Sequence, residues 1–89
     1  MASYSLADLK AACEKYLRTR PYHSHGFCWW AYRDAEDVSS DEVYSRISPF
    51  FYEYRKLHPE IGLRPYVSIE DGCVPERVAF VTWMLEQIA

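Results

Sequence analysis

Both ends of the chain carry apolar residues at helical spacing, and this pattern constrains the fold more than any other feature. In the N-terminal segment the apolar stripe comprises Leu6, Leu9, Cys13, Tyr16 and Leu17. In the C-terminal segment it comprises Val78, Val81, Leu85 and Ile88, widened by Phe80 and Met84, and it leaves out Arg77 and Glu86. Isolated helices of this length are not stable in water. We therefore expect helices over residues 5–19 and 75–88 to pack against each other.

Capping residues and prolines indicate where these helices begin and end. Ser5 is a suitable N-cap, and Asp8 stands three residues later, close to a capping box. Pro21 disfavours helical geometry at the residue before it, so the first helix should end near Thr19. Pro75 is suited to the first turn of the last helix.

The middle of the chain is less regular. Residues 27–32 are apolar at every position, which fits a buried strand or a short buried helix. We favour the helix, because residues 31–35 continue with helix-tolerant side chains. An acidic linker follows over residues 34–40, and Ser39 or Ser40 is suited to cap the next helix.

Two prolines divide the segment that follows the linker. Ser48 and Pro49 form a helix-restart signal, so we predict two helices meeting at Ser48, or one sharply kinked helix, ending at His58-Pro59. Residues 59–74 read as a loop, with residues 66–69 as an alternative short strand or extended strut. The expected fold is all-α or nearly all-α, with four or five short helices in one domain over residues 1–89.

Composition narrows the function classes. Hydrophobic residues make up 49% of the chain and aromatic residues 17%, which is ample for a core and argues against disorder. The net charge of −3 offers no basic surplus for nucleic acid or an anionic membrane. Residues 1–33 carry five cations and two anions, whereas residues 34–53 carry one cation and six anions. The folded protein should therefore present a basic end and an acidic end.

The cysteines and the apolar runs indicate the compartment. Three cysteines at irregular spacing do not form a disulfide framework. The first residues lack the features of a signal peptide, and the longest apolar run, residues 27–32, is far too short to span a membrane. We expect a cytosolic protein with reduced cysteines.

No group of residues points to a chemical reaction. His23, His25 and Cys28 suggest zinc, but a second ligand pair is missing, and two solvated histidines beside a buried cysteine are the favoured interpretation. Cys28 with His25 would align as nucleophile and base only on a helix, which Gly26 disfavours. The acidic linker does not match a calcium-binding loop. We therefore expect no enzyme, no metal and no cofactor.

The tyrosines, tryptophans and arginines favour binding to another macromolecule, because these residues are enriched at binding hot spots. Adjacent Trp29 and Trp30 cannot both face one core, so one of them should lie at a surface or an interface; the alternative is burial from opposite sides. Charge also changes sign in this region, which helps to orient a partner. The predicted partner-binding residues are Arg20, Tyr22, Trp30, Tyr32, Arg33, Asp34, Glu36 and Asp37.

Two other functions remain open. A small nucleotide-sequestering protein, as a homo-oligomer, would stack bases on its aromatic rings and meet phosphates with Arg18, Arg20, Arg33 and Arg64. A structural or assembly accessory protein is the other alternative.

Three segments resemble the small accessory proteins of tailed bacteriophages: the capped stretch from Ser5 to Leu17, residues 26–31 and the ending from Pro75 to Gln87. This resemblance implies a phage product in the host cytoplasm. Such a product binds a host protein, such as a bacterial defence component, and inhibits or redirects it.

Overall fold

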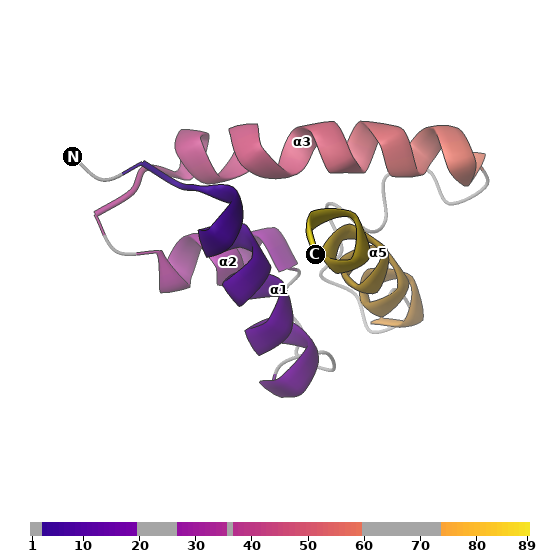
Figure 1. Cartoon of the computed structure of the whole chain (residues 1–89), viewed down its shortest axis with the longest axis horizontal. Coiled ribbons are helices and arrows are strands. Elements are labelled where there is room, and N and C mark those ends of the chain that lie inside the picture. The colour runs from indigo at the N-terminus through magenta and orange to yellow at the C-terminus, as the bar shows by residue number, and fades with distance from the viewer. Residues whose placement is uncertain (1–2, 20–26, 36, 60–73) are drawn as a thin grey trace.

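Four helices account for most of the residues that the computed structural model describes, which are 3–19, 27–35, 37–59 and 74–89. In chain order they are α1 (Leu6–Thr19), α2 (Phe27–Asp34), α3 (Ser40–Leu57) and α5 (Val74–Ile88), as Figure 1 shows. These described ranges contain no strand, so the predicted all-α fold is confirmed. The alternative strand at 66–69 lies outside the described residues.

Reciprocal hydrogen bonds at the start of α1 confirm the predicted capping box. The Ser5 hydroxyl accepts from the Asp8 N–H at 3.1 Å, and the Asp8 carboxylate accepts from the Ser5 N–H at 2.9 Å. Both donors would otherwise lack an intrahelical partner. The helix ends at Thr19, as predicted, and the Thr19 hydroxyl donates to the Lys15 carbonyl at 2.7 Å.

The apolar run at 27–32 forms α2, which confirms the helical interpretation. Phe27, Cys28 and Ala31 are buried, and they lie on one side of the helix. The connection to α3 passes through Asp37, whose φ of 57° places it in the left-handed region. Aspartate is among the few residues other than glycine that tolerate this conformation.

The prediction of two helices meeting at Ser48 is wrong, because α3 runs through Pro49 as one helix, and Figure 1 shows no sharp kink in it. A single buried stripe spans the proline: Val43, Ile47, Phe51 and Tyr54. Burying these four side chains together contributes more than the ~3 kcal/mol that an interior proline costs a helix. Pro49 itself lies on the exposed side, where its ring meets solvent.

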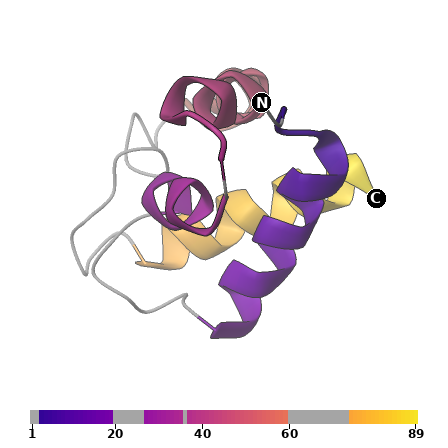
Figure 2. The ribbon, with the colours of Figure 1, turned by 90° about the vertical axis from the view of Figure 1, so that its left-hand side faces the viewer.

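All four helices contribute to one core. Figures 1 and 2 show α3 along one side of the molecule, with α2 and the start of α1 beneath its first half and α5 crossing beneath its second half. The most extensive packing joins α1 to α5, as predicted. Aromatic contacts join α3 to α5, with the ring of Phe80 5.3 Å from that of Tyr54 and 6.1 Å from that of Phe51.

Four residues are buried or exposed contrary to what the sequence pattern suggests. Leu6 is 46% exposed, although it was placed in the N-terminal stripe, whereas Tyr4 ahead of the helix is buried. Leu57 is also exposed, although its spacing of three residues from Tyr54 suggests a place on the apolar stripe of α3. Arg77, which was left out of the C-terminal stripe, is completely buried. It lies three, four and seven residues before Phe80, Val81 and Met84, so helical geometry places it on their face.

Candidate functional site

An outer face of exposed residues on α2 is the main candidate for a binding surface. Trp29 is 38% exposed and Tyr32 is 45% exposed. Arg33 is exposed as well, and its guanidinium carbon lies 5.3 Å from the centre of the Trp29 ring. These residues share one side of the helix, because they stand three and four positions apart. The buried side chains of α2 hold this outer face in place on the core.

Trp29, not Trp30, is the more exposed of the two adjacent tryptophans. Trp30 is half-buried, its indole nitrogen is buried, and its ring meets that of Trp29 edge to face at 4.7 Å. The prediction that one of the two rings reaches the surface is therefore confirmed by Trp29, and Trp30, the predicted partner-binding residue, is the less exposed of the two. Trp30 therefore packs against the more exposed Trp29 ring.

Tyr44 of α3 borders the outer face of α2. It is 38% exposed. Burial raises the pKa of its phenol, and the nearby Cys28 and Tyr32 raise it further. The effect of Tyr32 indicates that the two phenols lie near each other across the α2–α3 boundary. The sequence pattern does not single out Tyr44, because it stands beside Val43 and three residues before Ile47, which places it on the apolar side of a helix.

The other predicted partner-binding residues do not join this face as a group. Asp34 forms an ion pair with Lys15 of α1, with 3.5 Å between the carboxylate oxygen and the ammonium nitrogen. Asp37 is exposed in the turn after α2. Arg20, Tyr22 and Glu36 lie outside the described residues.

The described cysteines are buried and chemically quiet. Burial raises the pKa of Cys13 to about 12, with a smaller contribution from Glu14, and raises the pKa of Cys28 to about 12. Both thiols are therefore protonated at neutral pH, whereas a nucleophile or a metal ligand has to be a thiolate. Cys28 acts as a small apolar side chain of the core, which is the interpretation that the sequence favoured.

The described residues show no grouping suited to a metal ion, since no three histidine, cysteine or acidic side chains gather among them. His58 packs against the Tyr54 ring at 4.6 Å, and its backbone N–H donates to the Tyr54 carbonyl at 2.9 Å. His23 and His25 of the zinc hypothesis lie outside the described residues, as does Cys73.

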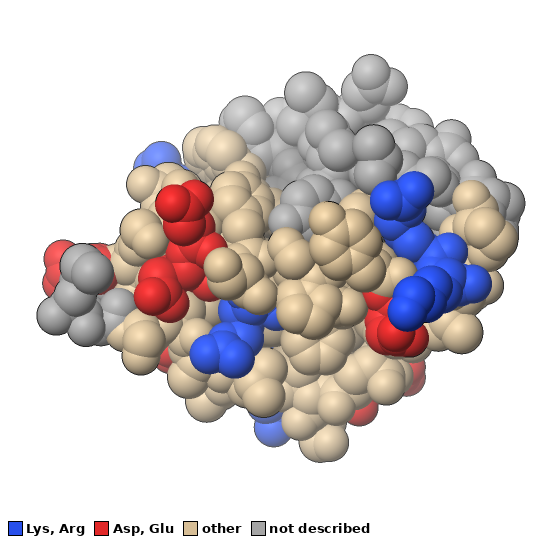
Figure 3. Space-filling view, turned by 90° about the horizontal axis from the view of Figure 1, so that it is seen from above, with Lys and Arg blue, Asp and Glu red and all other residues tan. Residues whose placement is uncertain are grey.

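Charge is distributed unevenly along α3. Asp41 and Glu42 occupy its first turn, and Arg55 and Lys56 occupy its last, which suits the helix dipole at both ends. Figure 3 shows acidic side chains over one end of this face and basic side chains, with an acidic neighbour, over the other. On this face of the molecule, the acidic and the basic side chains therefore gather at opposite ends of α3.

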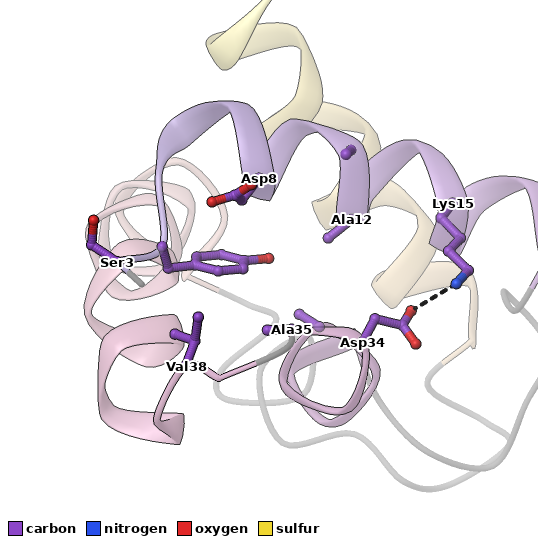
Figure 4. Close-up of a pocket in the computed structure, with 10 residues that line it drawn as sticks. Ser3, Asp8, Ala12, Lys15, Asp34, Ala35 and Val38 are labelled. Carbon is purple, nitrogen blue, oxygen red and sulfur yellow. Dashed lines mark ion pairs between the residues drawn. The ribbon is translucent and has the colours of Figure 1, made fainter. Parts of the chain in front are cut away.

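A cleft of about 430 Å³ lies between α1 and α2 (Figure 4). Four alanines line it: Ala11, Ala12, Ala31 and Ala35. Asp8 and Lys15 lie along its α1 side and Asp34 along its α2 side. The sequence analysis did not predict this cleft, although Ala31 and Ala35 stand four positions apart.

No helix in the described ranges has the length and apolar character needed to cross a lipid bilayer. Comparison with protein families, curated proteins and solved structures found no match for this chain.

Proposed function

We propose that this protein is a non-enzymatic binding protein that engages another macromolecule, a host protein, through the outer face of α2. The observation that carries this proposal is the cluster of Trp29, Tyr32 and Arg33 on one exposed side of a helix whose opposite side is buried. Tryptophan, tyrosine and arginine are the residue types that contribute most to binding free energy at protein interfaces. Because the opposite side of α2 packs against the core, the helix is already ordered, and binding costs little further conformational entropy.

Electrostatics supports the same surface. Arg33 is held over the Trp29 ring, which fixes the guanidinium while leaving its donors available for a carboxylate of the partner. Tyr32 and Tyr44 add rigid rings with polar tips beside it. The phage resemblance adds the proposal that the bound host protein is inhibited or redirected.

The test is a capture experiment with matched variants. The wild-type protein, the triple variant Trp29→Ala/Tyr32→Ala/Arg33→Ala and the control Tyr52→Ala/Leu57→Ala are immobilised and exposed to a bacterial lysate. The control removes two other exposed large side chains, which are 59% and 58% exposed. We expect at least one protein to be captured by the wild type and the control and lost with the triple variant. Equal capture by all three proteins, or no capture at all, would contradict the proposal, provided that circular dichroism shows all three folded.

The nucleotide alternative gains no support from the described residues. Its Arg20 and Arg64 lie outside them. The α1–α2 cleft carries two carboxylates and one ammonium group, which disfavours a phosphate there.

A further inference from the structure

The α1–α2 cleft is built by two facing stripes of short side chains. On α1, Asp8, Ala11, Ala12 and Lys15 stand at positions i, i+3, i+4 and i+7, which places them on one side of the helix. Ala31 on α2 and Ala35, directly after the end of α2, face them. Figure 4 shows Asp8 and Ala12 above, with Ala35 and Asp34 opposite them. The methyl groups leave the space between the helices unfilled, and the volume of about 430 Å³ falls within the range of small-ligand sites.

The charges along the cleft do not balance. Lys15 pairs with Asp34 at 3.5 Å, and Asp8 stands seven residues before Lys15, about 10 Å along the helix. Two carboxylates against one ammonium group leave an excess of one negative side-chain charge beside an apolar wall of alanines, and the Asp8 carboxylate also accepts the Ser5 N–H of the capping box.

The buried hydroxyl of Tyr4 is a second and independent feature of this site. Tyr4 lines the cleft and is 96% buried (4% exposed), and its hydroxyl oxygen has no hydrogen-bond partner among the described residues. Its pKa lies well above the usual value because of burial, with further contributions from the Cys13 thiol and the Asp8 carboxylate, among other groups. Tyr4 therefore brings a buried hydroxyl to the residues that line the cleft. A buried hydroxyl without a partner is uncommon, because it costs about 1–3 kcal/mol.

We infer that the α1–α2 cleft binds a small organic cation: a primary amine with a compact apolar body. Its body lies against the four alanines, and its ammonium group balances the excess charge of Asp8 and Asp34. A polar group on the body that reaches the inner end of the cleft would give the Tyr4 hydroxyl its missing partner. This site is separate from the proposed protein-binding face, since Trp29 and Arg33 project from the side of α2 opposite Ala31.

The experiment uses three probes of one shape and different charge: phenethylamine, 2-phenylethanol and phenylacetate. Each is titrated into the ¹⁵N-labelled protein, and amide chemical shifts are followed. We expect saturable shifts at Ala11, Ala12, Ala31 and Ala35 with phenethylamine, and about tenfold weaker binding of the neutral and anionic probes, because only the amine balances the charge.

Variants separate the cleft from general charge effects. Asp8→Asn and Asp34→Asn should each weaken phenethylamine binding up to about fivefold, the effect of one solvent-screened charge pair. Glu86→Gln removes the same charge from the exposed side of α5 and should leave binding unchanged. Ala12→Leu, which fills the cleft, should abolish the shifts.

Several outcomes would overturn the inference. They are no saturable binding, equal binding of all three probes, shifts confined to residues outside the cleft, and equal weakening by Glu86→Gln. Loss of folding in Ala12→Leu would leave the two asparagine variants as the decisive measurement. The capture experiment on the outer face of α2 is unaffected by any of these results.

Discussion

The Arg46 side chain donates a hydrogen bond from Nε to the Tyr4 carbonyl at 2.9 Å, across 42 positions of sequence. This contact joins the segment ahead of α1 to α3. It holds in place the backbone from which the buried Tyr4 ring enters the interior. The N-terminal segment is therefore part of the packed structure, although its sequence shows no helical pattern.

The Arg46 contact predicts a defined loss of stability. Arg46→Met keeps most of the aliphatic stem and removes the donor, so the free energy of unfolding should fall by about 1–2 kcal/mol. Urea denaturation followed by circular dichroism measures this change. Lys56→Met is the control, because the ion pair between Lys56 and Glu53 is exposed. Losing it should change the free energy of unfolding by less than about 0.5 kcal/mol. A similar loss in both variants would show that the contact has no special role.

Local sequence rules predicted the helix ends well, because caps depend only on near neighbours. Ser5 with Asp8 and Ser39 with Glu42 form the expected cap hydrogen bonds. The same rules failed at Pro49, where a buried stripe on the other side of α3 keeps the helix continuous. Packing between distant segments decides such a case, and a local signal does not contain that information.

The candidate site was predicted only in part. The choice of α2 and of Tyr32 and Arg33 agrees with their exposure in the structure, but which tryptophan reaches the surface depends on how the helix is rotated against the core. Arg77 was misplaced because a charged side chain was taken as a surface marker, although helical spacing puts it with Phe80 and Met84. The cleft was missed because alanines are common in helices and do not by themselves indicate a hollow.

Removing the proline from α3 should stabilise the protein. Pro49 is exposed, lacks the N–H that would bond to the Ser45 carbonyl, and its ring crowds that carbonyl. Pro49→Ala restores the donor without disturbing the buried stripe, so we expect a gain of about 1–3 kcal/mol in the free energy of unfolding. A rise in the urea midpoint with an unchanged slope would support this. A loss of stability would mean that the surrounding structure requires the proline geometry.

The cap of α3 offers a matched pair of serines. The Ser39 hydroxyl accepts from the Glu42 N–H at 3.3 Å, so Ser39→Ala should lower the free energy of unfolding by about 1 kcal/mol. Ser45 is exposed inside the same helix. Ser45→Ala should change the free energy of unfolding by less than about 0.5 kcal/mol, because alanine is the better helix former. Thermal unfolding of both variants checks the difference. Equal effects would contradict the assignment of Ser39 as the cap.

The buried thiols predict how stability depends on pH. Cys13 and Cys28 have a pKa of about 12 in the folded protein against the ordinary value of 9.0, because burial disfavours the thiolate. Their contribution to stability is complete below pH 9 and is lost as the pH rises from 9 toward 12, by up to about 1.4 kcal/mol per thiol and pH unit.

A labelling experiment tests the state of these thiols directly. In the Cys73→Ser variant, a thiol reagent at pH 8 should modify Cys13 and Cys28 only at the rate of unfolding. The control is the same variant in denaturing urea, which should react at once. Fast modification of the folded protein would show that at least one of the two thiols is accessible.

Arg77 is the residue whose replacement should reveal most about the interior. The Arg77 side chain is completely buried on α5. Burial raises the pKa of the Tyr16 phenol on α1, and Arg77 offsets part of that rise. The guanidinium thus lies near Tyr16 where α1 and α5 pack.

Arg77→Ala removes both the aliphatic stem and the charge from the core, so we expect a loss of about 3–5 kcal/mol in the free energy of unfolding. Arg77→Met keeps the stem and should recover part of that loss. Glu86→Ala, on the exposed side of the same helix, should change stability by less than about 0.5 kcal/mol. Urea titrations give the free energy of unfolding of the three variants, which should rise from Arg77→Ala through Arg77→Met to Glu86→Ala. An Arg77→Ala protein as stable as Glu86→Ala would contradict the burial of Arg77.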